Sequence, residues 1–522
     1  MGKADEGYAD GDWEELVTAA LLGTERRGGT PEALLDAAAV RTLRRRAGLR
    51  PAPAARRPDP APRDPRPAPP EAAGRRLALL LAGRTGTAGT GRRGAAPDLT
   101  ELLPQWLAAA GRHGYRAPSA LLPALLDAAR ARTDLRPQAL ALAGARGLWL
   151  ARLNPEWRFA LRGTAGGTGE LPDPADGEAV ARLWEEGLFA ERVALLGAVR
   201  AHEATAATRL LATTWAGERA EDRLMFLDSL RTGLSMADEP FLEAALGDRS
   251  RNVRATAAEL LSALPGSALA GRMAERALAC VGPEGVQPPA ECDAGMLRDG
   301  VVRRPPAGRG ERAWWLGQLV EAAPLSCWRD RFGGLDPAEL VALPVAEGWA
   351  EEIHAAWCRA AVRQRDAQWS KALLGAASAP PAAGPGTASL AERARLLETL
   401  PEGERAEWVA EFVRAHGLSE AFQLLGVCRV PWAGALGRAV VDALDAARAA
   451  GGYPWSFSGV MGLAERCLDP AEAGRLEALT ATVEEAREGG PGAAAYWAEA
   501  FQRLVATLRL RAAMLAELAP AS

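Results

Sequence analysis

The sequence predicts an all-α protein, built as an α-solenoid with a small helical head and a linker rich in proline and arginine. Alanine and leucine dominate the composition, β-branched residues are sparse, and aromatic residues make up only 6%. Stretches with apolar residues at helical spacing follow one another along most of the 522 residues. Glycine and proline separate these stretches, as expected where helices end.

Residues 1–50 form the predicted head. In "DWEELVTAALLGT", residues 12–24, Asp12 is a suitable N-cap, Gly23 ends the helix, and the apolar face consists of Trp13, Leu16, Val17, Ala20 and Leu21. The second head helix is "PEALLDAAAVRTLRRRAGL". Residues 51–98 follow as the linker, which begins with a proline-rich stretch without large apolar residues and ends in a glycine-rich one. Such a composition cannot form a core, so we expect this segment to be disordered.

Residues 99–287 are predicted to form a helical-repeat domain. Val193, Leu224 and Val253 begin three comparable apolar faces, 31 and 29 residues apart, and a second helix follows each of them. Paired amphipathic helices at a nearly constant period are typical of an α-solenoid. The stretch "DRSRNVRATAAELLSALP" resembles the second half of a HEAT-type repeat, through Asp248, Val253, Arg254, Ala257, Ala258 and Leu261. The period is shorter than in typical repeats of this type, so we expect irregular HEAT-like hairpins.

The rest of the chain is predicted to be a junction and a second helical region. Residues 288–313, "PPAECDAGMLRDGVVRRPPAGRGERA", have the composition of a surface loop or domain junction. Residues 314–522 contain further helical pairs and form the predicted C-terminal helical domain. The tryptophans in this region, for example Trp357 and Trp369, are expected to anchor the packing of helices.

No motif in the sequence specifies a reaction, a cofactor or a metal. The G-x-G-x-x-G at Gly89, Gly91 and Gly94 lacks the strand and helix of a dinucleotide site, so we interpret it as a loop. Glu351 and His354 form a single E-x-x-H, whereas a di-iron site needs two with further carboxylates. Six cysteines occur without a C-x-x-C pair, and no G-x-S-x-G is present. We therefore expect no cofactor, no metal and no enzymatic activity.

Charge and hydropathy patterns favour a soluble cytoplasmic protein. The net charge is −4 with a pI of about 5.9, which gives no overall attraction to nucleic acid or to an anionic membrane. The acidic start of the chain does not resemble a signal peptide, and no apolar run is long enough to span a bilayer. Lys3 and Lys371 are the only lysines, and the excess of arginine with alanine, glycine and proline indicates a GC-rich bacterial genome.

Several phrases resemble an uncharacterised bacterial family, domain of unknown function family 5691. They are "WEELVTAALLGTERR", "APSALLPALLDAA", "GARGLWLARLNPEW" and "LGDRSRNVRATAAELLSALPGSALAGRM". The resemblance implies a helical protein encoded near MoxR-type AAA ATPases and von Willebrand factor A domain proteins. It therefore suggests a partner or adaptor in such an assembly, without specifying a mechanism.

The function that these observations favour is a non-enzymatic scaffold that binds a protein partner. The candidate contact residues follow the first helix stop or begin the HEAT-like helix, and they are Thr24, Glu25, Arg26, Asp248, Arg251 and Arg254. Helix capping and salt bridges between repeats explain these residues equally well. The alternative is a HEAT-like nucleic-acid-binding protein or a DNA glycosylase-like enzyme, which would need a basic groove between residues 99 and 290.

Overall fold

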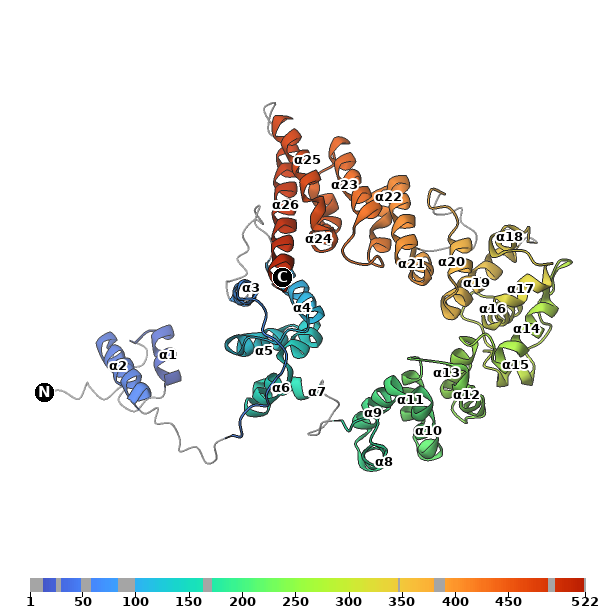
Figure 1. Cartoon of the computed structure of the whole chain (residues 1–522), viewed down its shortest axis with the longest axis horizontal. Coiled ribbons are helices and arrows are strands. Elements are labelled where there is room, and N and C mark those ends of the chain that lie inside the picture. The colour runs from blue at the N-terminus through green and yellow to red at the C-terminus, as the bar shows by residue number, and fades with distance from the viewer. Residues whose placement is uncertain are drawn as a thin grey trace. The chain divides into compact units, whose positions relative to one another are not determined.

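The structure, a computed structural model, is all-α, as predicted (Figure 1). It describes residues 13–24, 30–47, 58–82, 99–162, 171–345, 348–379, 390–486 and 493–520. These ranges contain 26 α-helices and one two-stranded hairpin, formed by β1 (Val281–Gly282) and β2 (Gly285–Val286). Contacts divide the chain into a smaller unit, residues 1–62, and a larger unit, residues 63–522.

The smaller unit consists of α1 (Trp13–Leu22) and α2 (Pro31–Ala47). Gly23 ends α1 with a left-handed φ of 87°, as the sequence predicted. Only Leu16 and Ala19 of α1 are buried, and they pack against Ala33, Leu34, Ala37 and Ala38 of α2. The rest of the predicted apolar face is exposed, because one partner helix covers only part of it.

The larger unit begins within the segment that we expected to be disordered. Residues 58–82 are ordered, and α3 (Glu71–Ala82) buries Ala73, Leu77, Leu80 and Leu81. The apolar run at the end of this segment supplies the core that the proline-rich part lacks. Residues 83–98, which include the G-x-G-x-x-G, lie outside the described residues.

Arg66 connects the proline-rich stretch to α6 (Arg136–Leu153). Gly144 interrupts this helix with φ 56° and ψ −155°, so the carbonyl groups before it are free to accept other hydrogen bonds. Arg66 donates to the carbonyl oxygens of Ala141, at 2.7 Å, and Leu142, at 3.4 Å. It also forms a 2.7 Å ion pair with Asp64, whose side chain is buried. A Cβ atom at Gly144 would overlap this guanidinium, which explains why glycine occupies the position.

The first helices of the larger unit share a core with the last helix of the chain. Their bounds are α4 (Leu99–Arg112), α5 (Leu122–Ala131), α7 (Phe159–Arg162) and α26 (Ala493–Leu518). Met514 and Leu518 of α26 are buried in the same cluster as Leu77 and Trp106. Arg76 pairs with Glu517 at 2.6 Å, and the hydroxyl of Tyr115 donates to the carbonyl oxygen of Leu518 at 3.0 Å. Residues 99–162 therefore pack with the end of the chain, an arrangement that the predicted 99–287 domain did not include.

The helix pairs predicted between residues 178 and 280 are present. Val193, Leu224 and Val253 lie in α9, α11 and α13, and a second helix follows each of them. α9 lies beside α10 and α12 beside α13, and α11 packs against both α9 and α13. The bounds are α8 (Gly177–Glu186), α9 (Phe189–His202), α10 (Ala204–Thr214), α11 (Ala220–Ser229), α12 (Glu239–Ala245), α13 (Arg251–Ser262) and α14 (Ala268–Cys280).

The predicted junction, residues 288–313, contains one short helix, α15 (Ala294–Arg298), followed by the buried Asp299. The helices beyond it continue the same core as the repeats. They are α16 (Glu311–Ala322), α17 (Ser326–Arg331), α18 (Pro337–Ala342), α19 (Ala350–Gln364), α20 (Ala367–Leu374), α21 (Leu390–Thr399), α22 (Glu402–Leu425), α23 (Gly434–Ala449), α24 (Ser458–Cys467) and α25 (Ala473–Ala486). Trp357 and Trp369 are buried and contact each other, as expected for packing anchors.

Replacement of Arg66 by alanine is expected to loosen the proline-rich stretch. The Arg66→Ala variant leaves the buried Asp64 unpaired and removes the donor to α6, so the free energy of unfolding should fall by about 2–3 kcal/mol. Hydrogen–deuterium exchange should become faster at the amide of Ala117, which donates to Leu142 beside this contact. Arg63→Ala, an exposed change in the same stretch, is the control. Equal exchange in both variants would contradict the docking role of Arg66.

Candidate functional site

The larger unit contains a cavity of about 730 Å³ at the end of α13. A volume of this size is within the range of ligand-binding pockets. Its walls come from the α11–α12 connection, α13, α16, α19 and α21, which are far apart in the sequence. The lining residues are Arg231, Gly233, Leu234, Glu259, Leu260, Ala263, Leu264, Glu321, Cys358, Arg359, Val362, Arg363, Gln364, Arg365, Glu392 and Arg395.

Three of the lining arginines are held by carboxylates. Arg231 pairs with Glu259 of α13 at 2.9 Å and with Asp228 at 2.8 Å. Glu321 of α16 accepts hydrogen bonds from both Arg359, at 2.5 Å, and Arg363 of α19. Hydrogen bonds to charged groups are stronger than neutral ones, so these contacts fix the walls relative to one another.

Two arginines of the lining are free of such contacts. Arg365 and Arg395 are exposed, and neither side chain forms a hydrogen bond or an ion pair with any residue that the structure describes. Arg365 ends α19 in a left-handed conformation, with φ 53° and ψ 41°. Every other described residue with a positive φ is a glycine. Arginine at this position is strained relative to glycine, so its side chain is retained at a cost in stability.

Leu260, Leu264 and Val362 form an apolar part of the lining, which we call the floor. Leu260 of α13 and Leu264 of the turn after it are buried, and Val362 of α19 is half-buried. Cys358 also lines the cavity, and burial raises the pKa of its thiol to about 12. The thiol is therefore protonated at neutral pH and is a poor nucleophile, so its contribution is to packing.

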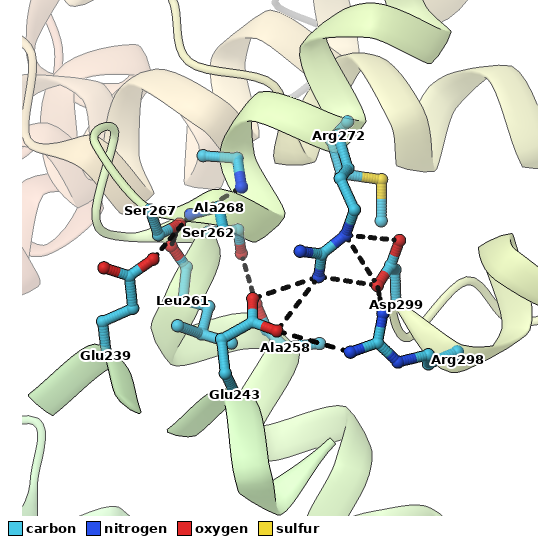
Figure 2. Close-up of polar contacts among 12 residues, drawn as sticks. Glu239, Glu243, Ala258, Leu261, Ser262, Ser267, Ala268, Arg272, Arg298 and Asp299 are labelled. Carbon is cyan, nitrogen blue, oxygen red and sulfur yellow. Dashed lines mark hydrogen bonds and ion pairs between the residues drawn. The ribbon is translucent and has the colours of Figure 1, made fainter. Parts of the chain in front are cut away.

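A network of ion pairs joins the helices that precede and follow α13 in the sequence (Figure 2). The carboxylate of Asp299 is only 1% exposed and accepts hydrogen bonds from Arg272, at 2.8 Å, and Arg276, at 2.7 Å. Arg272 also reaches Glu243 of α12 at 3.0 Å. These contacts connect the helices on either side of α13, namely α12 and α14, with the residue after α15.

The turn between α13 and α14 is fixed by side chains that cap both helices. Glu239 accepts a hydrogen bond from the amide of Ala268 at 2.6 Å, and the hydroxyl of Ser267 accepts from the amide of Ala270 at 3.1 Å (Figure 2). The Ser267 hydroxyl also donates to the carbonyl oxygen of Leu261 at 2.8 Å. Because Leu264 lies within this turn, its capping positions the apolar floor.

The predicted contact residues of the HEAT-like helix lie outside the cavity. Asp248 forms a 3.3 Å ion pair with Arg223 of α11, and both side chains are nearly buried. Arg254 donates to the backbone carbonyl of Asp248 at 2.7 Å, whereas Arg251 is exposed. This geometry matches the capping and inter-repeat interpretation for Asp248 and Arg254.

The other predicted contact residues follow α1 in the smaller unit. Thr24 is half-buried at the end of this helix, and Glu25 and Arg26 lie outside the described residues. Sequence reasoning did not single out Arg365 or Arg395, because arginine is abundant throughout the chain. The one available signal was the absence of glycine after α19, in the sequence "RQRDA".

Other candidate chemistry has a structural role in the described residues. His354 is buried within α19, and burial lowers the pKa of its imidazole, so it is neutral at physiological pH. No group of three or more histidine, cysteine, aspartate or glutamate residues in the described ranges could hold a metal ion. Among the helices that the structure describes, none combines the length and apolar character needed to cross a bilayer.

Arginines between residues 99 and 290 are frequently paired with carboxylates. Examples are Arg130 with Glu156 at 2.8 Å and the two arginines on Asp299. Their positive charge is offset within the protein, so these contacts do not support the nucleic-acid interpretation.

The geometry defines the class of the protein as an all-α chain of packed helix pairs. The chain belongs to a family described as "Family of unknown function (DUF5691)", whose model matches residues 15–518. This match confirms the resemblance seen in the sequence. No curated protein and no solved structure is significantly similar to the chain.

The buried carboxylate of Asp299 should make stability depend on acid pH. Burial alone would raise the pKa of Asp299, but hydrogen bonds from Arg272 and Arg276 outweigh it and lower the pKa below its usual value. Stability from this group is therefore complete above the unfolded pKa of about 3.9 and is lost as the pH falls below it. Asp299→Asn should lower the free energy of unfolding at pH 7 and reduce its loss between pH 4 and pH 2.

Urea denaturation followed by circular dichroism at pH 7, 4 and 2 measures this dependence. The matched control is Asp442→Asn, which removes an exposed carboxylate that pairs with Arg475. An acid-induced loss of stability as steep in Asp299→Asn as in the unaltered protein would contradict the assignment.

Proposed function

We propose that the protein is a non-enzymatic helical scaffold that binds a protein partner through its smaller unit. The observation that carries the proposal is the set of large apolar side chains that α1 and α2 leave exposed. Leu21 is 80% exposed and Leu35 is 69% exposed, and Leu22, Val40 and Leu43 add to them. Two helices are too few to bury such side chains, and exposed apolar groups of this kind mark protein-binding surfaces.

The architecture supports a scaffold rather than a catalyst. The buried charged groups Arg200, Asp238 and Asp299 are paired with one another or with neighbouring arginines, and so have structural roles. Helical pairs with HEAT-like character present successive helix surfaces to a partner. Six free cysteines, three of them buried, fit the proposed cytoplasmic location.

The proposed partner is a MoxR-type AAA ATPase or a von Willebrand factor A domain protein. This part of the proposal comes from the genomic context of the family. In the sequence, the acidic first turn of α1, with Glu14 and Glu15, precedes the exposed apolar side chains, and the basic last turn of α2, with Arg44, Arg45 and Arg46, follows them. Charges around an apolar centre favour orientation and selectivity in binding.

Capture of partners from the native host tests the proposal. The tagged full-length chain should recover an ATPase or a von Willebrand factor A protein, identified by mass spectrometry in the presence and absence of ATP. The double change Leu21→Asp and Leu35→Asp places charges on exposed positions, so the helical circular dichroism should remain while recovery falls at least tenfold.

Leu79→Asp is the matched control, since Leu79 is also exposed but lies on α3 of the larger unit. Equal recovery of the partner by the double variant and by Leu79→Asp would show that the smaller unit is not the binding surface. Failure to recover either class of protein under both nucleotide conditions would contradict the adaptor model.

A further inference from the structure

The lining of the cavity beside α13 contains more arginines than the carboxylates of the protein pair with. Its lining contains five arginines and three glutamates. Arg231 is matched by Glu259, and Glu321 is shared by Arg359 and Arg363. Two further arginines, Arg365 and Arg395, have no such contact with the described residues. The whole lining therefore has an excess of two positive charges, and its two arginines without ion pairs are exposed.

The conformation of Arg365 indicates that its side chain has a role of its own. A left-handed residue at a helix end is usually glycine, which adopts this conformation without strain. At the end of α19 the chain has arginine instead, with φ 53°. The amide of Arg365 donates to the carbonyl oxygen of Val362 at 3.3 Å as part of the helix cap, but its guanidinium forms no hydrogen bond or ion pair with a described residue. A guanidinium without a partner at such a position is available to a ligand.

We propose that this cavity binds a short acidic segment of a protein partner. Arg365 and Arg395 would hold carboxylates of the segment, and an apolar side chain of the segment would pack on Leu260, Leu264 and Val362. The proposal rests on the proposed scaffold function, and it adds a second contact surface with a defined chemistry.

The lining favours carboxylates over a polyphosphate ligand. Guanidinium groups bind carboxylates and phosphates alike through paired hydrogen bonds. However, Glu259, Glu321 and Glu392 also line the cavity and oppose a ligand of high charge density. A polyphosphate would also leave the apolar floor uncovered, whereas a peptide that alternates acidic and apolar residues matches both parts of the lining.

Binding of defined peptides to the full-length chain tests the proposal. The probe is a fluorescein-labelled library of short peptides with aspartate or glutamate around leucine, followed by fluorescence anisotropy. The control library has asparagine and glutamine in place of the acidic residues. We expect members of the acidic library to bind with micromolar affinity and the amide library to bind at least tenfold more weakly.

Substitutions at the two free arginines should separate binding from stability. Arg365→Gly and Arg395→Ala should each weaken the acidic peptide about tenfold, because each removes a charged hydrogen bond. Arg365→Gly should at the same time keep or raise the midpoint of thermal unfolding, since glycine relieves the left-handed strain. Arg414→Ala, an exposed arginine on α22, is the matched control and should change neither quantity.

Several results would overturn the proposal. They are the absence of binding across the acidic library, equal binding of the amide library, and unchanged affinity in Arg365→Gly and Arg395→Ala. Displacement of the peptide by ATP or inorganic phosphate at lower concentration than by unlabelled peptide would assign the cavity to phosphates instead.

The two proposals can fail separately. If the Arg365→Gly and Arg395→Ala variants recover as much partner from the host as the unaltered chain does, the cavity does not contribute to partner binding. The smaller unit would then remain the proposed contact surface. If the chain binds acidic peptides but recovers neither class of partner, the proposed adaptor function is contradicted. The assignment of an acidic peptide ligand to the cavity would still stand.

Discussion

Pairing between arginine and carboxylate side chains of successive helices is the constraint on which the larger unit depends. Arg200 and Asp238 are each 1% exposed and form a 2.8 Å ion pair. Arg200 also donates to the carbonyl oxygen of Leu230, at 2.9 Å, and Thr208 donates to Asp238 at 2.6 Å. A buried charge without a partner is costly, so this cluster restricts α9, α10 and the segment before α12 to one arrangement. Exposed pairs elsewhere add little by comparison.

The same chemistry explains how the cavity is formed and why two of its arginines stand out. Ion pairs through Glu321 and Asp299 hold the helices around α13, so the cavity walls do not depend on Arg365 or Arg395. An arginine that neither pairs nor packs contributes little to folding. In a chain whose basic residues are almost all arginine, residue type alone does not separate the structural arginines from the free ones. The hydrogen bonds and ion pairs in the structure distinguish the structural arginines from the free ones.

The sequence identified the helices and their pairing because helical periodicity is local. The spacing of apolar residues and the positions of glycine and proline predicted α9 to α14 and the end of α1 at Gly23. Short sequence stretches that resemble the family predicted the family itself. The expected disorder of residues 51–98 did not hold for residues 58–82, since composition describes a segment by itself. Arg66 contacts carbonyl groups that the break of α6 at Gly144, far along the chain, leaves free to accept hydrogen bonds.

By itself, therefore, the sequence determined an all-α chain of amphipathic helix pairs, since each helix requires only neighbours within a few residues. Tertiary structure alone decided that α26 completes the core of α3 and α4, where Arg76 meets Glu517 across more than four hundred residues. It also decided that Asp248 pairs with Arg223, and that Arg365 and Arg395 meet at one cavity. These relations depend on which side chains the packed helices bring within hydrogen-bonding distance, and no local pattern encodes them.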